Sequence, residues 1–284
     1  RLESLLAVAR GLEEEGLTTY LYCGSTSELP PVTLTGRVRT DIIFIDKIIG
    51  VGEISISELG PSMDSLGPGI QMVAEAAAEA HMAARLAGKA GVVCLQIPTG
   101  GRGLAPLLEM LTKTQLPVTQ FIPSHANSHP GFLAQAIEFA RMGGIVDLGS
   151  THTPTYGFPY AIEVGPALRQ VLDAGVPIDR ITLSSDGNGS SGWHYLPVGS
   201  LLSALREIVQ QQGVELWQAL KLVTANPARL LCLTQRKGAV QAGLDADLIV
   251  MDRDLVIHQV YARGRKMVDD GVPIVRSAWE RVFQ

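Results

Sequence analysis

Four polar side chains end or follow short apolar runs in this sequence, and their chemical types suit a metal-dependent reaction. The four are Glu53 in IIGVGEISIS, Gln96 in VVCLQIP, His125 after QFIPS and Asp186 after ITLSS. Two carboxylates and an imidazole that converge from different strands would bind a divalent metal such as zinc. An aspartate in such a site could also take a proton from a water molecule that the metal activates. The pattern therefore predicts a metal site in which Asp186 is the catalytic residue.

Ordinary structural roles compete with this interpretation. Glu53 could cap the helix that follows its strand, as isolated acidic residues at strand ends often do. His125 lies in SHANSHP, in which Ser124, Asn127 or His129 could equally be polar loop or helix-cap residues. The choice between a ligand and a loop residue stays open for both.

The next two candidates lie in turn-rich sequences. Asp186 begins DGNG, which allows tight backbone turns close to a ligand but is also an ordinary turn sequence. His152 in STHTPT could approach the same region from the preceding strand, but we expect it to be a polar loop residue.

The elements that would position these residues alternate along the chain. Short β-branched runs alternate with longer helical patterns, which is typical of βα units around a parallel sheet. Strands are predicted within 18–23, 42–56, 92–97, 118–122, 145–148 and 181–184. Helices with apolar residues at i, i+3 and i+4 are predicted over 2–15, 69–86, 104–112, 131–141 and 161–172. Gly91, Gly143 and Gly175 supply the residue that ends a helix before the next strand. Six units leave two architectures open, part of an eight-stranded (β/α)8 barrel or an open parallel sheet.

The last 50 or so residues have a different pattern. Short strands over 246–252, 256–262 and 266–268 are separated by turn sequences, which predicts a small β appendage. We therefore expect a barrel domain over residues 1–236 and a small β domain with the C-terminal tail over 237–284.

Composition limits the classes of partner. The 284 residues are 46% hydrophobic and carry a net charge of −5 without a Lys/Arg cluster, which argues against a nucleic-acid-binding protein. The apolar runs are too short for a membrane helix. Cys23, Cys94 and Cys232 are too few and too far apart for a disulfide framework, which fits a reducing cytoplasm. A small-molecule substrate is the expected partner.

Several motifs together resemble one enzyme family. They are SSDGNGS at 184–190, FIPSHAN, EFARMGGIVDL, IDKIIGVGEISIS and the tail GLDADLIVMDRDLVIHQVYARGRKMVDDG. The sequence resembles isoaspartyl (β-aspartyl) dipeptidases of the amidohydrolase superfamily over nearly its whole length. The resemblance implies a (β/α)8 barrel with a small β-sandwich, one or two zinc ions, a homo-oligomer, and hydrolysis of the amide bond formed by an aspartate side chain.

The resemblance also implies roles for individual residues. Asp186 would bind metal, act as general base toward the attacking water and then protonate the leaving amine. His125 would be a metal ligand, and Glu53 would take the place of a bridging ligand that is a carboxylated lysine or a glutamate. Ser190 would contact the α-carboxylate of the substrate. A tyrosine that polarises the scissile carbonyl would fall near Thr26 or the next residue.

Other positions depart from the family pattern. Gln96 replaces a histidine, and an amide oxygen is a weaker zinc ligand than imidazole. Gly60 and Ser128 stand where the family has arginines that bind the dipeptide, so a dipeptide would have to be bound through other groups, such as Ser128 or its neighbour Asn127. No His-x-His pair is present in the expected context. These departures predict either an amide hydrolase with an altered substrate or a non-catalytic scaffold of the same fold.

The position of the resemblance adds a structural expectation. It begins inside the second helix of the barrel, so we expect an N-terminal segment or another chain to complete the strands. An unrelated nucleotide-binding sheet is a third interpretation, but TGGRG at 99–103 lacks the Lys and Ser/Thr of a phosphate-binding loop.

Overall fold

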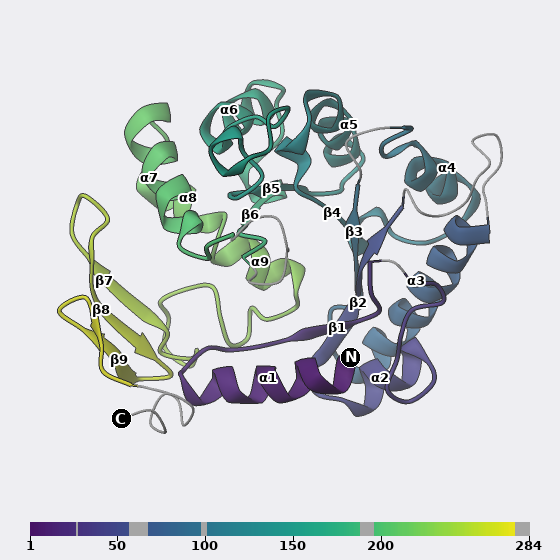
Figure 1. Cartoon of the computed structure of the whole chain (residues 1–284), viewed down its shortest axis with the longest axis horizontal. Coiled ribbons are helices and arrows are strands. Elements are labelled where there is room, and N and C mark those ends of the chain that lie inside the picture. Colours follow the sequence, from purple (N-terminus) through teal and green to yellow (C-terminus); the bar gives the residue numbers. More distant parts are fainter. Residues whose placement is uncertain (27, 57–67, 98–100, 188–195, 276–284) are drawn as a thin grey trace.

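Six parallel strands follow one another in sequence order through the molecule (Figure 1). The computed structural model describes residues 1–26, 28–56, 68–97, 101–187 and 196–275. The strands are β1 (Leu21–Cys23), β2 (Ile48–Ser55), β3 (Val92–Gln96), β4 (Phe121–Ser124), β5 (Val146–Gly149) and β6 (Ile181–Ser184). Each overlaps a predicted strand, but β4 shares only Phe121 and Ile122 with the predicted range 118–122, because residues 118–120 form a 3-10 turn.

The strand order is that of a barrel rather than of a doubly wound sheet. Strands β1 to β4 form one parallel sheet in sequential order, β5 pairs with β6, and β5 packs beside β4. The order never reverses, whereas a doubly wound sheet reverses direction at a switch point. The fold is therefore of the TIM-barrel type, as predicted, and the nucleotide-binding open sheet is excluded.

Most helices lie outside this layer of strands, and the last helix in the sequence lies on its inner side (Figure 1). They are α1 (Leu2–Glu14), α2 (Val38–Phe44), α3 (Pro68–Ala87), α4 (Ala105–Lys113), α5 (Pro130–Arg141), α6 (Val164–Asp173), α7 (Ser200–Gln212), α8 (Leu216–Lys221) and α9 (Ala225–Leu230). Short 3-10 turns precede or follow the strands: η1 (Val118–Gln120), η2 (Ala126–Ser128), η3 (Pro154–Tyr156) and η4 (Ile178–Arg180). The five helices predicted from periodicity match α1, α3, α4, α5 and α6 within three residues at each end.

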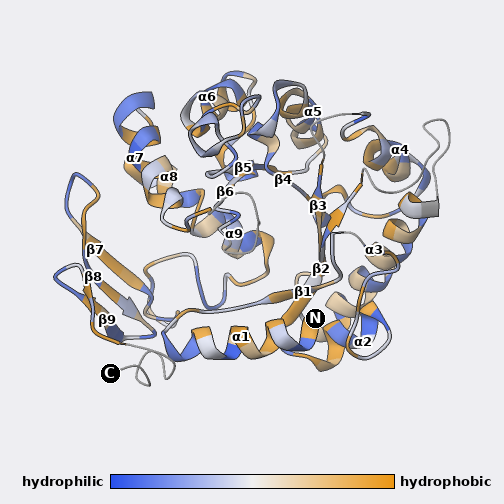
Figure 2. Cartoon of the chain, viewed as in Figure 1, coloured by the Kyte–Doolittle hydropathy of each residue, from blue (hydrophilic) through white to orange (hydrophobic). Residues whose placement is uncertain are grey.

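The strands divide their side chains between two apolar clusters. Val93 and Leu95 belong to the large core, which also contains buried residues of the helices. Val92, in the same strand, belongs instead to a small cluster with Ile122 and Ile145. Successive side chains of a strand point to opposite faces, so the second cluster lies on the other face of the strands, where Leu230 of α9 packs against it. Figure 2 shows β2 and β3 as largely hydrophobic, as expected for strands covered on both faces.

Gly143 and Gly175 end helices in the way that the sequence predicts, whereas α3 ends at Ala87 and is followed by Gly88 (φ +64°), three residues before Gly91. Gly91, Gly143 and Gly175 have φ angles of +62°, +102° and +81°. Glycine adopts this left-handed conformation without steric cost, which allows the chain to leave a helix and enter the next strand.

The C-terminal region forms a four-stranded antiparallel sheet in the order β10–β9–β8–β7. Its strands are β7 (Leu248–Met251), β8 (Ile257–Ala262), β9 (Arg265–Asp269) and β10 (Val272–Pro273). The first three confirm the predicted β appendage. The domain boundary between residues 236 and 237 stays a prediction.

Among the described helices, none is both long and apolar enough to cross a membrane.

Candidate metal centre

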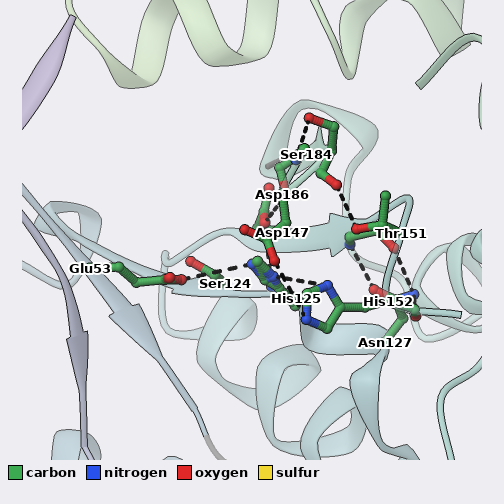
Figure 3. A network of polar contacts seen from close by, with 12 residues as sticks. Glu53, Ser124, His125, Asn127, Asp147, Thr151, His152, Ser184 and Asp186 are labelled. Carbon is green, nitrogen blue, oxygen red and sulfur yellow. Dashed lines mark hydrogen bonds and ion pairs between the residues drawn. The ribbon is translucent and has the colours of Figure 1, made fainter. Parts of the chain in front are cut away.

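Three side chains from neighbouring strand ends converge at one point (Figure 3). His125 directly follows β4, His152 lies three residues after β5, and Asp186 lies two residues after β6. One potential ligand atom from each lies within 4.8 Å of those of the other two. Because carboxyl ends of parallel strands meet at one face of a barrel, side chains distant in sequence come together here.

The two histidines are in direct contact. Their Nδ1 atoms lie 3.4 Å apart, and their ring centroids lie 3.9 Å apart in an edge-to-face arrangement. Phe158 stacks on the other side of His152, with a centroid distance of 4.4 Å. Burial lowers the pKa of His152 to about 4 and that of His125 well below its usual value. Both imidazoles are therefore neutral at pH 7, which is the form that binds metals.

Two carboxylates flank the histidines. An Asp186 oxygen lies 3.8 Å from His152 Nε2, and a Glu53 oxygen lies 3.7 Å from His125 Nε2. These distances are longer than hydrogen bonds. Burial raises the pKa of both carboxyl groups, and a hydrogen bond from Ser124 partly offsets this for Glu53. The two neutral imidazoles therefore lie between the carboxyl group of Glu53, beside His125, and that of Asp186, beside His152.

A buried nitrogen at the centre of this group lacks a hydrogen bond. His125 Nε2 is inaccessible to solvent and has no hydrogen-bond partner among the described residues. Buried polar atoms are nearly always satisfied, so this atom points to a partner of another kind. Two neutral imidazoles and a carboxylate are a donor set that zinc accepts, whereas Glu53 lies beside His125 but outside the three residues that converge. The residues present therefore fit a zinc ion.

The backbone at two of these residues adopts the left-handed conformation. His125 has a φ of 58° and Asp186 a φ of 47°. Such conformations cost free energy for residues other than glycine and are concentrated at functional sites. Thr151 Oγ1 donates to the carbonyl of Ser185 at 2.6 Å and so ties the His152 loop to the Asp186 loop.

Gly149, the last residue of β5, leaves room for the imidazoles of His125 and His152 to approach each other. A Cβ atom at this position would lie 3.1 Å from His152 Nδ1 and 3.3 Å from His125 Cβ. These contacts are closer than side chains normally tolerate. The absence of a side chain at Gly149 is therefore part of the geometry of the site.

A third carboxylate lies beneath the site and was not singled out by sequence reasoning. Asp147 in β5 accepts hydrogen bonds from Thr182 Oγ1 at 2.8 Å, Ser184 Oγ at 2.7 Å and the His125 amide at 3.4 Å. Burial raises its pKa to about 6. It connects β5 to β6 and holds the backbone at His125. An acidic residue inside the apolar strand IVDLG was the signal that could have identified it.

Asn127 has all of its amide hydrogen-bonding groups engaged by backbone atoms. Its nitrogen donates to the carbonyls of Gly149, His152 and Ile162 at 3.1, 2.8 and 2.9 Å, and its oxygen accepts from the Gly149 amide at 2.7 Å. These contacts hold the His125 and His152 loops together, and a substrate-binding role for Asn127 stays a prediction. Ser128 is also buried, and its hydroxyl has no hydrogen-bond partner within the described ranges.

The remaining predicted site residues lie either outside the three residues that converge or outside the described ranges. Gln96 is exposed at the end of β3, in register with Ser124 of β4. Thr26 is exposed after β1, and its carbonyl accepts from the Ser55 amide at 3.2 Å. Ser190 and Gly60 lie outside the described residues. The roles of Gln96, Thr26, Ser128 and Ser190 stay predictions.

His152 differs from its predicted role. It lies in a loop, as expected, but its side chain is buried against His125 and is close to Asp186. Sequence reasoning missed it because only the folded chain brings the two loops together. The isolated histidine in STHTPT carried no spacing signal.

Comparisons with known proteins agree with this geometry. The model of the amidohydrolase family matches residues 38–273. The β-aspartyl dipeptidase of Fervidobacterium islandicum AW-1 is 34% identical, with a TM-score of 0.85 over 98% of this chain and 71% of that one. A structure described as its complex with the dipeptide β-Asp-Leu is 32% identical, with a TM-score of 0.84 over 98% and 73% of the two chains.

A more distant sequence relative has a different activity in its name. The N-acetylglucosamine-6-phosphate deacetylase of Danio rerio is 31% identical over 130 residues, or 41% of this chain and 32% of that protein. The chain thus spans about a third of the length of this curated relative.

Proposed function

We propose that this chain, which belongs to the amidohydrolase family, hydrolyses an amide bond in a small, dipeptide-like substrate. It would use a zinc ion bound to the protein for this reaction. The observation that supports this most strongly is the convergence of His125, His152 and Asp186 within 4.8 Å. Members of the family are hydrolytic enzymes, and the dipeptidases of Fervidobacterium match nearly the whole chain. The site lies at the carboxyl ends of the strands, where TIM-barrel enzymes have their active sites.

The residues of the site would divide the work between them. His125, His152 and Asp186 would hold the zinc ion, with Glu53 as a further ligand. When bound, zinc polarises the scissile carbonyl and lowers the pKa of a water molecule. Asp186 would accept a proton from the attacking water and transfer it to the nitrogen of the leaving amine. Burial raises the pKa of Asp186, which favours its role as a proton carrier.

The substrate is proposed to differ from a free β-aspartyl dipeptide. The resemblance implies two arginines that bind the carboxylates of the dipeptide, and this chain has Gly60 and Ser128 in their places. Neither can form the paired, charge-assisted hydrogen bonds of a guanidinium group. A substrate with fewer or differently placed carboxylates fits these residues better.

Hydrolysis assays on a panel of amides test this proposal. The zinc-reconstituted chain would be given β-aspartyl dipeptides and N-acyl amino acids, beside Asp186→Asn and the control Asp173→Asn. Asp173 is exposed at the end of α6. We expect Asp186→Asn to lose at least about 100-fold in rate, as expected for loss of a general base and metal ligand, and Asp173→Asn to retain the rate. Absence of hydrolysis of every amide by the wild-type chain would contradict the proposal and favour a non-catalytic scaffold.

A further inference from the structure

A cavity lies at the opposite end of the strands from the metal centre. Its volume is about 660 Å³, which is within the range of small-molecule sites. Val92 at the start of β3 and Ile145 just before β5 form part of its wall. Helix α9, which packs against β6 (Figure 1), supplies another part. The cavity is therefore separated from the metal centre by about the length of a four-residue strand, roughly 13 Å.

Gln120, which lines this cavity, has an unpartnered side-chain oxygen. The residue is 5% exposed and lines the cavity just before β4. Its amide nitrogen donates to the carbonyls of Ala77 and Gly91, both at 2.8 Å. These two bonds fix the orientation of the amide and leave Oε1 buried, with no hydrogen-bond partner among the described residues.

Asn226 has the same arrangement of hydrogen bonds at another part of the cavity lining. It is 2% exposed, lies in α9 and lines the same cavity. Its amide nitrogen donates to the carbonyls of Ile178 and Ile181 at 2.8 and 2.7 Å. Its Oδ1 is likewise buried and has no hydrogen-bond partner in the part of the chain that is described. A buried acceptor without a donor costs about 1–3 kcal/mol, so two in one cavity indicate a missing donor.

Two arginines make the same cavity electropositive. Arg180 and Arg229 line it, and each donates one guanidinium nitrogen to a backbone carbonyl. The carboxylate of Asp179, which also lines the cavity, is paired with Lys221 Nζ at 3.2 Å. Within the described ranges neither guanidinium forms an ion pair. Their remaining N–H groups are suited to a carboxylate or another anion.

We propose that this cavity binds a small molecule that combines an anionic group with neighbouring N–H donors, and that the ligand is a free α-amino acid. The ammonium group supplies donors for Gln120 Oε1 and Asn226 Oδ1. The carboxylate accepts from Arg180 and Arg229. The site is distinct from the metal centre, because it lies at the amino ends of strands whose carboxyl ends carry the metal ligands.

Calorimetric titration of the full chain with individual L-amino acids tests this inference. Acetate and methylammonium chloride, at matched ionic strength, represent the two halves of the ligand. Arg229→Met removes an exposed guanidinium from the rim, and Thr119→Trp places a large ring at an exposed position of the cavity lining. Thr112→Trp, at an exposed position of α4 that does not line this cavity, is the matched control.

We expect at least one amino acid to bind saturably to the wild-type chain, and each half-molecule to bind at least tenfold more weakly. Arg229→Met and Thr119→Trp should each weaken binding at least tenfold, and Thr112→Trp should leave it unchanged. If no amino acid binds, the cavity holds only water and the inference is overturned. Binding that survives both cavity variants, as binding at the metal centre would, also overturns it. Because Arg229 is exposed, its variant still decides the matter if Thr119→Trp does not fold.

Discussion

His125 and His152 bring their Nδ1 atoms to within 3.4 Å of each other, although they follow different strands and are separated by an entire helix. Burial keeps both rings neutral, and Asp186 lies beside them. His125 Nε2, in one of these rings, is buried without a hydrogen-bond partner among the described residues, whereas buried polar atoms normally have one. A metal ion bound there, as proposed above, would be the partner of this atom.

Asn127 should be more important for stability than its neighbour Ser128. Asn127→Leu leaves the Gly149 amide and three carbonyls without their partner, and we expect the free energy of unfolding to fall by about 3 kcal/mol. Ser128→Ala removes a buried hydroxyl that has no partner among the described residues, and should change stability by less than about 0.5 kcal/mol. Urea denaturation measures both. Equal losses in the two variants would refute the clamping role of Asn127.

His152 should make the metal-free protein sensitive to mild acid. Its pKa is about 4 in the folded chain and about 6.5 when unfolded. Between these values the unfolded state binds more protons, so stability falls as the pH falls. From pH 7.5 to 5 the wild type should lose about 2 kcal/mol more than His152→Gln. The raised pKa of Asp147, about 6, acts in the opposite direction but is common to both proteins.

Denaturation curves in the presence of a chelator at several pH values give this difference. Identical pH profiles for the wild type and His152→Gln would show that His152 is not held neutral by burial.

Gly149 should be needed for metal binding even though it provides no ligand. In Gly149→Ala the new methyl group presses on the His152 imidazole and on the Cβ atom of His125, and we expect a 10- to 100-fold loss of zinc affinity, as for other residues that orient ligands. Gly199→Ala is the matched control, because a Cβ there meets no atom within 4 Å. Competition with a chromogenic chelator measures both affinities. A Gly149→Ala protein that binds zinc as the wild type does would contradict the proposed positions of the rings.

The fold was largely predictable because its signals are local. β-branched runs, helical periodicity and glycines at helix ends act over a few residues, and the six strands and five helices follow from them. The arrangement of the strands was not fixed by their number, since six units suit either a barrel or an open sheet. Only the pairing of β1 to β4 and of β5 with β6 distinguishes the two.

The site was predictable only in part. His125 and Asp186 stand at strand ends in recognisable motifs, and the structure brings them to one place. His152 and Asp147 were missed for different physical reasons. The role of His152 depends on contact between two loops, and Asp147 is a charged residue whose burial is compensated by hydroxyl groups from the neighbouring strand.

The zinc content of the reconstituted chain tests the central claim most directly. After loading with zinc and removal of free metal, wild type, His152→Asn and His258→Asn would be compared by elemental analysis. His258 lies in β8 of the C-terminal sheet, beside Asp252, and is the matched control. We predict close to one equivalent of zinc per chain in the wild type and in His258→Asn, and less than about a tenth of this in His152→Asn. Equal zinc content in all three proteins, or none in the wild type, would contradict a metal centre at His125, His152 and Asp186.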